Sequence, residues 1–317
     1  MIRNSRSPAS IWRYDRQVGL VKERYFHPSE WEEQTPLQAE EFYQSLKETF
    51  LRVLPRYLAA PSIAMSLTGG LDGRMIMAGA HAEPGALPCY TFNGPYRDCA
   101  DLRIARDLAR LCQQTHRTIS VGENFLSQFA ALAETSVYIS DGTMDVTGAV
   151  ELYVNRIARE IAPVRLTGNY GSEIVRGNVA FRPTRIDRSL LVPDLVTLID
   201  EAGVTYRDER NCVEPSFVAF KQTPWHHYAR LSVEQSQLIL RTPFLDNELV
   251  SLMYRAPLGS YENPANVLRL IAECDPRLDA VPSDRGLRQN EGYMDQVIRR
   301  AIDFSVKGWN AVINTNL

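Results

Sequence analysis

The sequence predicts an α/β fold with a mainly parallel sheet, and two similar stretches are the basis of this prediction. In residues 62–78, an apolar run short enough for a buried parallel strand leads into a turn of small residues and then into a helix-compatible segment. Residues 164–177 repeat this layout, with an apolar strand, a glycine turn and an acidic residue. The chain therefore carries two strand–loop units of a kind that can meet at one edge of a sheet.

The first loop has the chemistry of an anion site. Gly69 and Gly70 let the backbone approach an anion closely, and Thr68 adds a hydroxyl donor. The N-terminus of the following helix offers unpaired N–H groups and the positive end of a dipole. Asp72 would repel a bare phosphate, so it indicates a bridging Mg²⁺ held jointly by carboxylate and phosphate oxygens. The competing interpretation is a tight turn of an ordinary α/β protein.

Elements around this loop follow from apolar spacing and turn residues. We expect a helix over 35–58 with Pro36 in its first turn, a helix over 75–82 and a strand over 87–92. Asn93-Gly94-Pro95 then forms a loop. Because ligands of parallel sheets bind beyond the carboxyl ends of the strands, Thr68–Asp72 and Phe92–Gly94 should lie on one edge.

The middle of the chain reads as further helices and one strand. An amphipathic helix begins at Asp98, and Asp98 and Asp101 are interpreted as helix caps rather than metal ligands. A strand over 118–121 is followed by a mostly helical segment to residue 134, and then by a loop over 140–145 whose aspartates are expected to be turn residues. Helices are expected over 150–161, 190–202 and 294–304.

The amino-acid composition limits the classes of protein to which the chain can belong. The 317 residues are 44% hydrophobic and 23% charged, which is ordinary for a chain that forms a core. The net charge of −3 gives no basis for a nucleic-acid or anionic-membrane surface. Five cysteines without C-x-x-C spacing fit reduced thiols, and neither a signal peptide nor a transmembrane run is evident, so we expect a cytoplasmic protein.

The first loop also resembles a known family motif. The string Ser66-Leu67-Thr68-Gly69-Gly70-Leu71-Asp72-Gly73 resembles the S-G-G-L-D-S pyrophosphate loop of the N-type ATP pyrophosphatases, in the form found in the synthetase domains of asparagine synthetases and β-lactam synthetases. Thr68 replaces a serine conservatively, whereas Gly73 lacks the hydroxyl of the second serine. Arg241–Asp246 is similar to the family's R-x-P-F-L-D, with Asp246 expected to be a helix N-cap.

The resemblance covers roughly residues 35–290 and implies a sheet of the adenine-nucleotide α-hydrolase type with an added, mostly helical lobe. On this basis we divide the chain into an irregular lead-in (1–35), an ATP-pyrophosphatase core (36–180) and a mostly helical part (181–317). The resemblance also implies the residues that bind ATP, namely Ser66, Leu67, Thr68, Gly69, Gly70, Leu71, Asp72, Gly73, Phe92, Asn93 and Gly168.

The second loop resembles the family's G-[DE]-G-[SA]-D-E, and two alignments are open. Without a gap, Asn169 takes the first acidic place, Ser172 that of the metal aspartate and Glu173 that of the final glutamate. With one inserted residue, Tyr170–Ile174 overlays the Y-G-S-D-I of β-lactam synthetases. We prefer the second alignment, in which Tyr170 is a member of a base dyad and Glu173 joins Asp72 as a ligand of Mg²⁺.

The expected catalytic lysines are missing. Ala265 stands at one lysine position of the family, and Asp284 or Arg285 stands at the other. Arg285 could supply a permanent positive charge for phosphate but not general acid or base chemistry. His226 and His227 are adjacent and point in different directions on a helix, so at most one could face substrate.

The resemblance to the asparagine synthetase family implies an ATP-dependent amide ligase. A substrate carboxylate would form an acyl-adenylate with release of pyrophosphate, and ammonia or an amine would displace AMP. Position 2 is Ile2 and the first cysteine is Cys89, so the N-terminal cysteine of a glutaminase domain is absent and a separate glutaminase partner or free ammonia is expected. Two alternatives stay open: a sulfur- or nitrogen-transfer enzyme of the same superfamily, and a non-catalytic relative that binds nucleotide or a partner protein.

Overall fold

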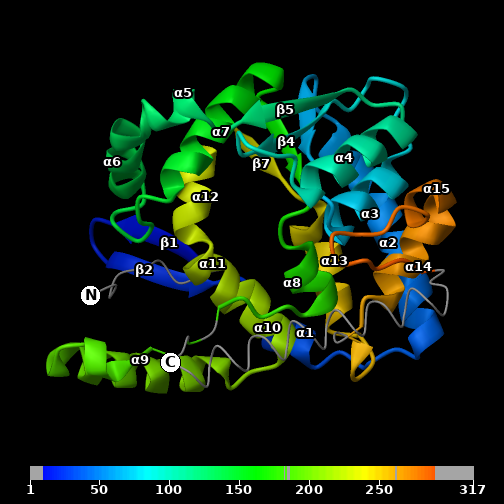
Figure 1. Cartoon of the computed structure of the whole chain (residues 1–317). Coiled ribbons are helices and arrows are strands. Elements are labelled where there is room, and N and C mark those ends of the chain that lie inside the picture. The colour runs from blue at the N-terminus through cyan, green and yellow to red at the C-terminus, as the bar shows by residue number, and fades with distance from the viewer. Residues whose placement is uncertain (1–9, 182, 184–185, 261–262, 290–317) are drawn as a thin grey trace.

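A five-stranded parallel sheet forms the centre of the molecule (Figure 1). The computed structural model describes residues 10–181, 183, 186–260 and 263–289. The strands are β3 (Ile63–Ser66), β4 (Cys89–Asn93), β5 (His116–Ser120), β6 (Val164–Thr167) and β7 (Ile239–Arg241), in the spatial order β5-β4-β3-β6-β7. The predicted α/β class is confirmed. The order reverses at β3, whose two neighbours are β4 and β6, and such a switch point is where open parallel sheets bind ligands.

Helices connect the strands and cover both faces of the sheet. The helices of the first half are α1 (Ser29–Glu32), α2 (Ala39–Leu58), α3 (Leu71–Ala80), α4 (Ala100–Leu111), α5 (Glu123–Leu126), α6 (Phe129–Ile139), α7 (Gly148–Ile161) and α8 (Gly171–Arg176). Those of the second half are α9 (Pro193–Arg210), α10 (Glu214–Phe217), α11 (Thr223–His226), α12 (Tyr228–Gln235), α13 (Asn247–Met253), α14 (Ala265–Cys274) and α15 (Pro276–Asp279), with short turns η1 (Arg188–Leu190), η2 (Val218–Gln222) and η3 (Pro243–Leu245).

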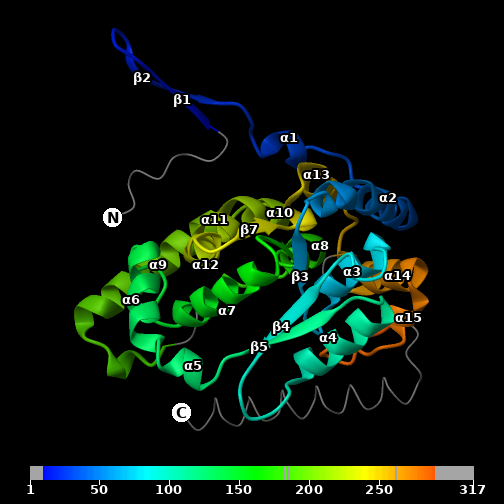
Figure 2. The same ribbon diagram turned by 90° about the horizontal axis from the view of Figure 1, so that it is seen from above.

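The two faces of the sheet have separate hydrophobic cores. Side chains alternate along β3, so Met65 packs with α2, α3, α13 and α14, whereas Ala64 packs with α6, α7 and α12. Figures 1 and 2 show the first group of helices on one side of the sheet and the second group on the other. The described residues between 186 and 289 form several helices and also supply the edge strand β7.

Arg74 locks the segment after α14 onto the first glycine loop. Its side chain is 1% exposed and donates to the carbonyl oxygens of Leu278 (3.1 Å), Val281 and Pro282 (3.2 Å). It also donates to the carbonyl oxygen of Gly69 at 3.4 Å, which accepts a second bond, from the Asp284 N–H, at 3.1 Å. The loop is thus held from behind by a buried cation whose pKa burial lowers to about 10.

The expectation of an irregular, strand-poor lead-in is wrong. Strands β1 (Ser10–Asp15) and β2 (Gly19–Arg24) form an antiparallel hairpin, which projects from the rest of the molecule in Figure 2. Its turn is stabilised by Asp15, whose carboxylate accepts the N–H groups of Gln17 and Val18, and by Gly19 at φ 82°. After the hairpin, Phe26 and Trp31 pack on the rest of the molecule, because their rings contact Phe220.

Other boundaries differ by a few residues from the predictions. The helix expected over 35–58 begins at Ala39, after Pro36, and the one expected over 190–202 runs from Pro193 to Arg210. Asp145 accepts the Thr147 N–H, and Asp246 caps α13 through the Glu248 N–H, so both are structural as predicted. The helix expected over 294–304 lies outside the described residues. Within the described ranges, no helix combines the length and the apolar character needed to cross a membrane.

Replacing Arg74 tests the buried clamp. Arg74→Met leaves four carbonyl oxygens without their charged donor, and we expect the free energy of unfolding to fall by about 3 kcal/mol. The exposed Arg103→Met on α4 is the matched control and should change it by less than about 0.5 kcal/mol. Urea unfolding measures both variants, and equal stabilities would contradict the clamp.

Candidate active site

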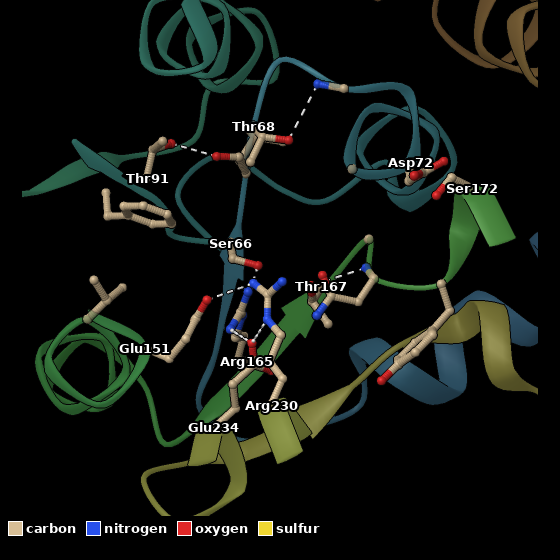
Figure 3. A pocket seen from close by; sticks show the side chains of 18 of the residues that line it. Ser66, Thr68, Asp72, Thr91, Glu151, Arg165, Thr167, Ser172, Arg230 and Glu234 are labelled. Carbon is tan, nitrogen blue, oxygen red and sulfur yellow. Dashed lines mark hydrogen bonds and ion pairs between the residues drawn. The ribbon is translucent and has the colours of Figure 1, made fainter. Parts of the chain in front are cut away.

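A cavity of about 360 Å³ lies at the carboxyl ends of β3, β4 and β6 (Figure 3). Residues from both glycine loops line it, together with side chains from α7 and α12. Figure 3 shows Thr68 and Asp72 at one end, and Glu151, Arg165, Arg230 and Glu234 at the other, with Ser66 between them. We call these two ends the loop end and the floor.

The two glycine loops touch over Asp72. A Cβ atom on Gly168 would lie 2.7 Å from the backbone nitrogen of Gly73, and one on Gly171 would lie 2.7 Å from the Cβ of Asp72. Only glycine allows this approach of the loop after β6 to the first turn of α3. Between them, Tyr170 has a φ of 73°, which is uncommon for a bulky residue and turns the chain into α8. The predicted meeting of the two loops is confirmed.

Asp72 is paired with a cation from the second loop. Its Oδ1 atom lies 2.8 Å from an Nη of Arg176 at the end of α8. Burial nevertheless raises the pKa of Asp72 to about 6, against the effect of Arg176, and the nearby Glu173 carboxylate raises it further. Ionisation of Asp72 therefore costs free energy, and an additional cation nearby would stabilise its charged form.

Glu173, His227 and Tyr170 form the wall next to Asp72. Glu173 accepts the Ser172 hydroxyl at 2.7 Å and lies 3.8 Å from Nε2 of His227. The Tyr170 ring stands edge-on to the His227 ring at 5.1 Å. Burial lowers the pKa of His227 and raises that of Tyr170, so both side chains are neutral near pH 7. Of the two adjacent histidines, it is His227 that lines the cavity.

One N–H group of the first loop is already engaged. The Gly69 N–H donates to Oδ1 of Asp101 at 2.8 Å, so this aspartate caps the neighbouring loop and not its own helix, whose N-cap is Cys99. The Gly70 N–H has only a long 3.4 Å contact with the Thr68 hydroxyl. An anion at this loop would therefore use Gly70 and the first turn of α3.

The structure places most, but not all, of the predicted site residues at the cavity. The lining includes Ser66, Leu67, Thr68, Gly70, Asp72, Gly73, Phe92, Gly168, Tyr170 and Glu173. Four residues are outside it: Gly69, Leu71, Asn93 and Arg285. Asn93 instead bonds the Gly94 and Arg97 carbonyls and the Cys99 N–H. Arg285 is exposed on the segment behind the loop, where only the Asp284 backbone contacts Gly69.

The floor was not predicted from the sequence. Arg165 stands between two apolar residues of β6, and Arg230 and Glu234 are spaced i,i+4 on α12. Both features are sequence signals of a charge cluster. Glu151 completes the cluster from the first turn of α7. No group of three or more His, Cys, Asp or Glu suited to a metal ion occurs in the described ranges.

Two solved structures are distantly similar to this chain. No family model and no curated protein matches the chain. It is similar to the structure of NMN synthetase from Francisella tularensis, with 17% identity and a TM-score of 0.28 over 44% of this chain and 58% of that one. It is also similar to glutamine-dependent NAD+ synthetase from Acinetobacter baumannii in complex with ADP, with 15% identity and a TM-score of 0.32 over 54% of this chain and 32% of that one. The chain thus spans less than two thirds of either protein.

The raised pKa of Asp72 predicts a pH-dependent stability. Because its folded pKa of about 6 exceeds the ordinary 3.8, the native state binds more protons than the unfolded state between these values. The free energy of unfolding should therefore fall by up to about 3 kcal/mol, relative to Asp72→Asn, as pH rises from 4 to 7. Urea unfolding of both proteins across this range measures the difference, and a constant difference would show that Asp72 titrates normally.

Proposed function

We propose that the chain is an ATP-dependent amide-bond-forming ligase resembling asparagine synthetase. It would activate a carboxylate as an acyl-adenylate with release of pyrophosphate, and ammonia or an amine would then displace AMP. The observation that carries this proposal is the contact of the two glycine loops over Asp72, at the switch point of a parallel sheet. The loop sequence Ser66–Gly73 resembles a pyrophosphate loop, and it lies where a nucleotide would bind.

The loop end is suited to the departure of pyrophosphate. The N-terminus of α3 has no side-chain cap, and Gly70, Asp72 and Gly73 at this end line the cavity, so the positive end of the helix dipole lies at the cavity edge. Arg176 lies beside Asp72 and would supply a cation at the loop end, in place of the expected lysine and of Arg285. Hydrogen-bond donors that are already in position stabilise the negative charge that grows in the transition state. The energy of the transition state therefore falls without any rearrangement of the protein.

Mg²⁺ fits the carboxylates at this end. Asp72 and Glu173 both line the cavity, and they lie close enough for the charge of Glu173 to add to the burial that raises the pKa of Asp72. Mg²⁺ takes one or two protein carboxylates together with phosphate oxygens, so two such side chains are sufficient. When bound, it would neutralise pyrophosphate charge, while Arg176 would be released from Asp72 toward phosphate.

Tyr170 is proposed to contact the reacting groups from the opposite loop. Its hydroxyl is protonated near neutral pH because burial raises its pKa, so it would donate a hydrogen bond and would act as a base only after losing its proton to a partner. The acid and amine substrates are small molecules or peptides, and a separate glutaminase is a proposed nitrogen source.

A second candidate function is nucleotide binding without catalysis. The Asp72–Arg176 ion pair favours this function, because Arg176 already neutralises Asp72, the proposed metal ligand. Two further observations favour it: Gly73 lacks a hydroxyl, and no lysine of the described residues lines the cavity. A family member with this arrangement could bind nucleotide or a partner protein and not turn over.

Pyrophosphate release separates the two functions. The native chain, incubated with Mg²⁺-ATP and pools of carboxylic acids and amines, should release pyrophosphate only when both a carboxylate and Mg²⁺ are present. Asp72→Asn should lower this rate by at least about 100-fold, as loss of transition-state charge stabilisation predicts. Asp98→Asn is the control, because Asp98 is an exposed partner of Arg106 outside the cavity.

Carboxylate-dependent release that survives Asp72→Asn would contradict the assigned loop end. Binding of ATP without release across all pools would favour the second function.

A further inference from the structure

The floor of the cavity is a cluster of four charges from three elements, in which Glu234 is fully buried and Arg230 reaches solvent. Glu151 comes from α7, Arg165 from β6, and Arg230 and Glu234 from α12 (Figure 3). Arg230 lies 2.9 Å from Oε1 of Glu151 and 2.9 Å from Oε1 of Glu234. Arg165 lies 3.5 Å from the same Glu234 oxygen. Two positive and two negative groups thus balance one another next to an open cavity.

The arginines of the floor are already compensated. Besides Glu234, Arg165 donates from Nε to the Ser66 hydroxyl and from Nη1 to Oδ1 of Asn155, both at 3.0 Å. Arg230 donates to both carboxylates. A carboxylate or phosphate entering the floor would compete with these protein acceptors and would meet the glutamates. The floor is therefore poorly suited to an anion.

Two polar atoms of the floor have no partner. Oε2 of Glu234 and the hydroxyl oxygen of Tyr90 are buried without a hydrogen bond in the described part of the chain. Glu234 is 0% exposed and Tyr90 is 3% exposed, and both line the cavity. Glu234 and Tyr90 lie close enough for the carboxylate to raise the pKa of the phenol. Burying such atoms unpaired is costly, so a ligand that satisfies both would bind with a large gain.

The unpaired carboxylate oxygen can only accept, so the ligand must donate. An ammonium group has three N–H donors and one positive charge, and Glu234, Tyr90 and Glu151, which all line the cavity, offer three oxygen acceptors for them. We propose that the floor binds the ammonium group of a primary amine through Glu234, Glu151 and Tyr90. To act as the nucleophile of the ligase, the bound ammonium group would first have to pass one proton to a floor carboxylate, because only the neutral amine has a free electron pair. This role rests on the proposed function; the binding itself does not.

The environment of Glu151 supports this assignment. Burial raises the pKa of Glu151, and Glu234 adds to the effect through its charge and a side-chain hydrogen bond, against the influence of Arg230 and Arg165. A bound cation would favour the charged form of Glu151 and so oppose these effects. The floor and the loop end share one cavity, with Ser66 linking them through Arg165, so an amine held at the floor faces the nucleotide end.

Binding of two simple cations tests the proposal. Dissociation constants of methylammonium and tetramethylammonium chloride are measured by calorimetry at pH 7.5 and constant ionic strength, with sodium acetate as the anion probe. Methylammonium should bind at least tenfold more tightly than tetramethylammonium, which has the same charge but no N–H donor. Glu234→Gln should weaken methylammonium at least tenfold, and Glu248→Gln, a surface ion-pair partner of Arg56, should not change it.

Tyr90→Phe keeps the test decisive if Glu234→Gln fails to fold. This variant removes only an unpaired hydroxyl, so its melting temperature should be equal or higher, while methylammonium binding weakens about threefold or more. Equal affinities for the two ammonium ions, tighter binding of acetate, or unchanged binding in Tyr90→Phe would overturn the proposal. Binding of an ATP analogue is measured in parallel, so failure at the floor and failure of the proposed function are seen separately.

Discussion

The contact of two glycine loops over Asp72 is the constraint on which the rest of the structure depends. Gly168 and Gly171 bring the end of β6 against the first turn of α3, at distances that no side chain permits. This contact fixes the edge of the sheet at which the cavity opens. On the other side, the Gly69 carbonyl of the first loop accepts hydrogen bonds from Arg74 and from the Asp284 N–H. The first loop is thus held between the loop after β6 and the segment that contains Asp284, which are both far from it in sequence.

The two ends of the cavity handle charge differently. At the loop end, Asp72 and Glu173 carry negative charge that Arg176 only partly compensates, which suits an additional cation or a cation-bound anion. At the floor, the arginines are compensated but a glutamate oxygen is left unpaired. Under the proposed function, a nucleotide and an amine would thus have distinct places in one cavity, which would hold the two reacting substrates close together.

Local sequence signals predicted those parts of the structure that depend on residues close together in the sequence. The glycine loops, the parallel strands and the Asp246 cap follow from short-range turn, strand and capping chemistry. The floor could not be found in this way, because Arg165, Glu151 and Glu234 meet only after three elements pack. Asp101 likewise caps a loop 32 residues away rather than its own helix. The hairpin at residues 10–24 was missed because its exposed faces lack the apolar alternation of a buried strand.

A crystal structure of the protein with Mg²⁺ and α,β-methylene-ATP tests the central claim most directly. The account predicts the β- and γ-phosphates at Thr68–Gly70 and the start of α3, a metal ion on Asp72 and Glu173, and Arg176 turned from Asp72 toward phosphate. A nucleotide bound elsewhere, or phosphates at this loop with the Asp72–Arg176 ion pair intact and no metal ion, would contradict it.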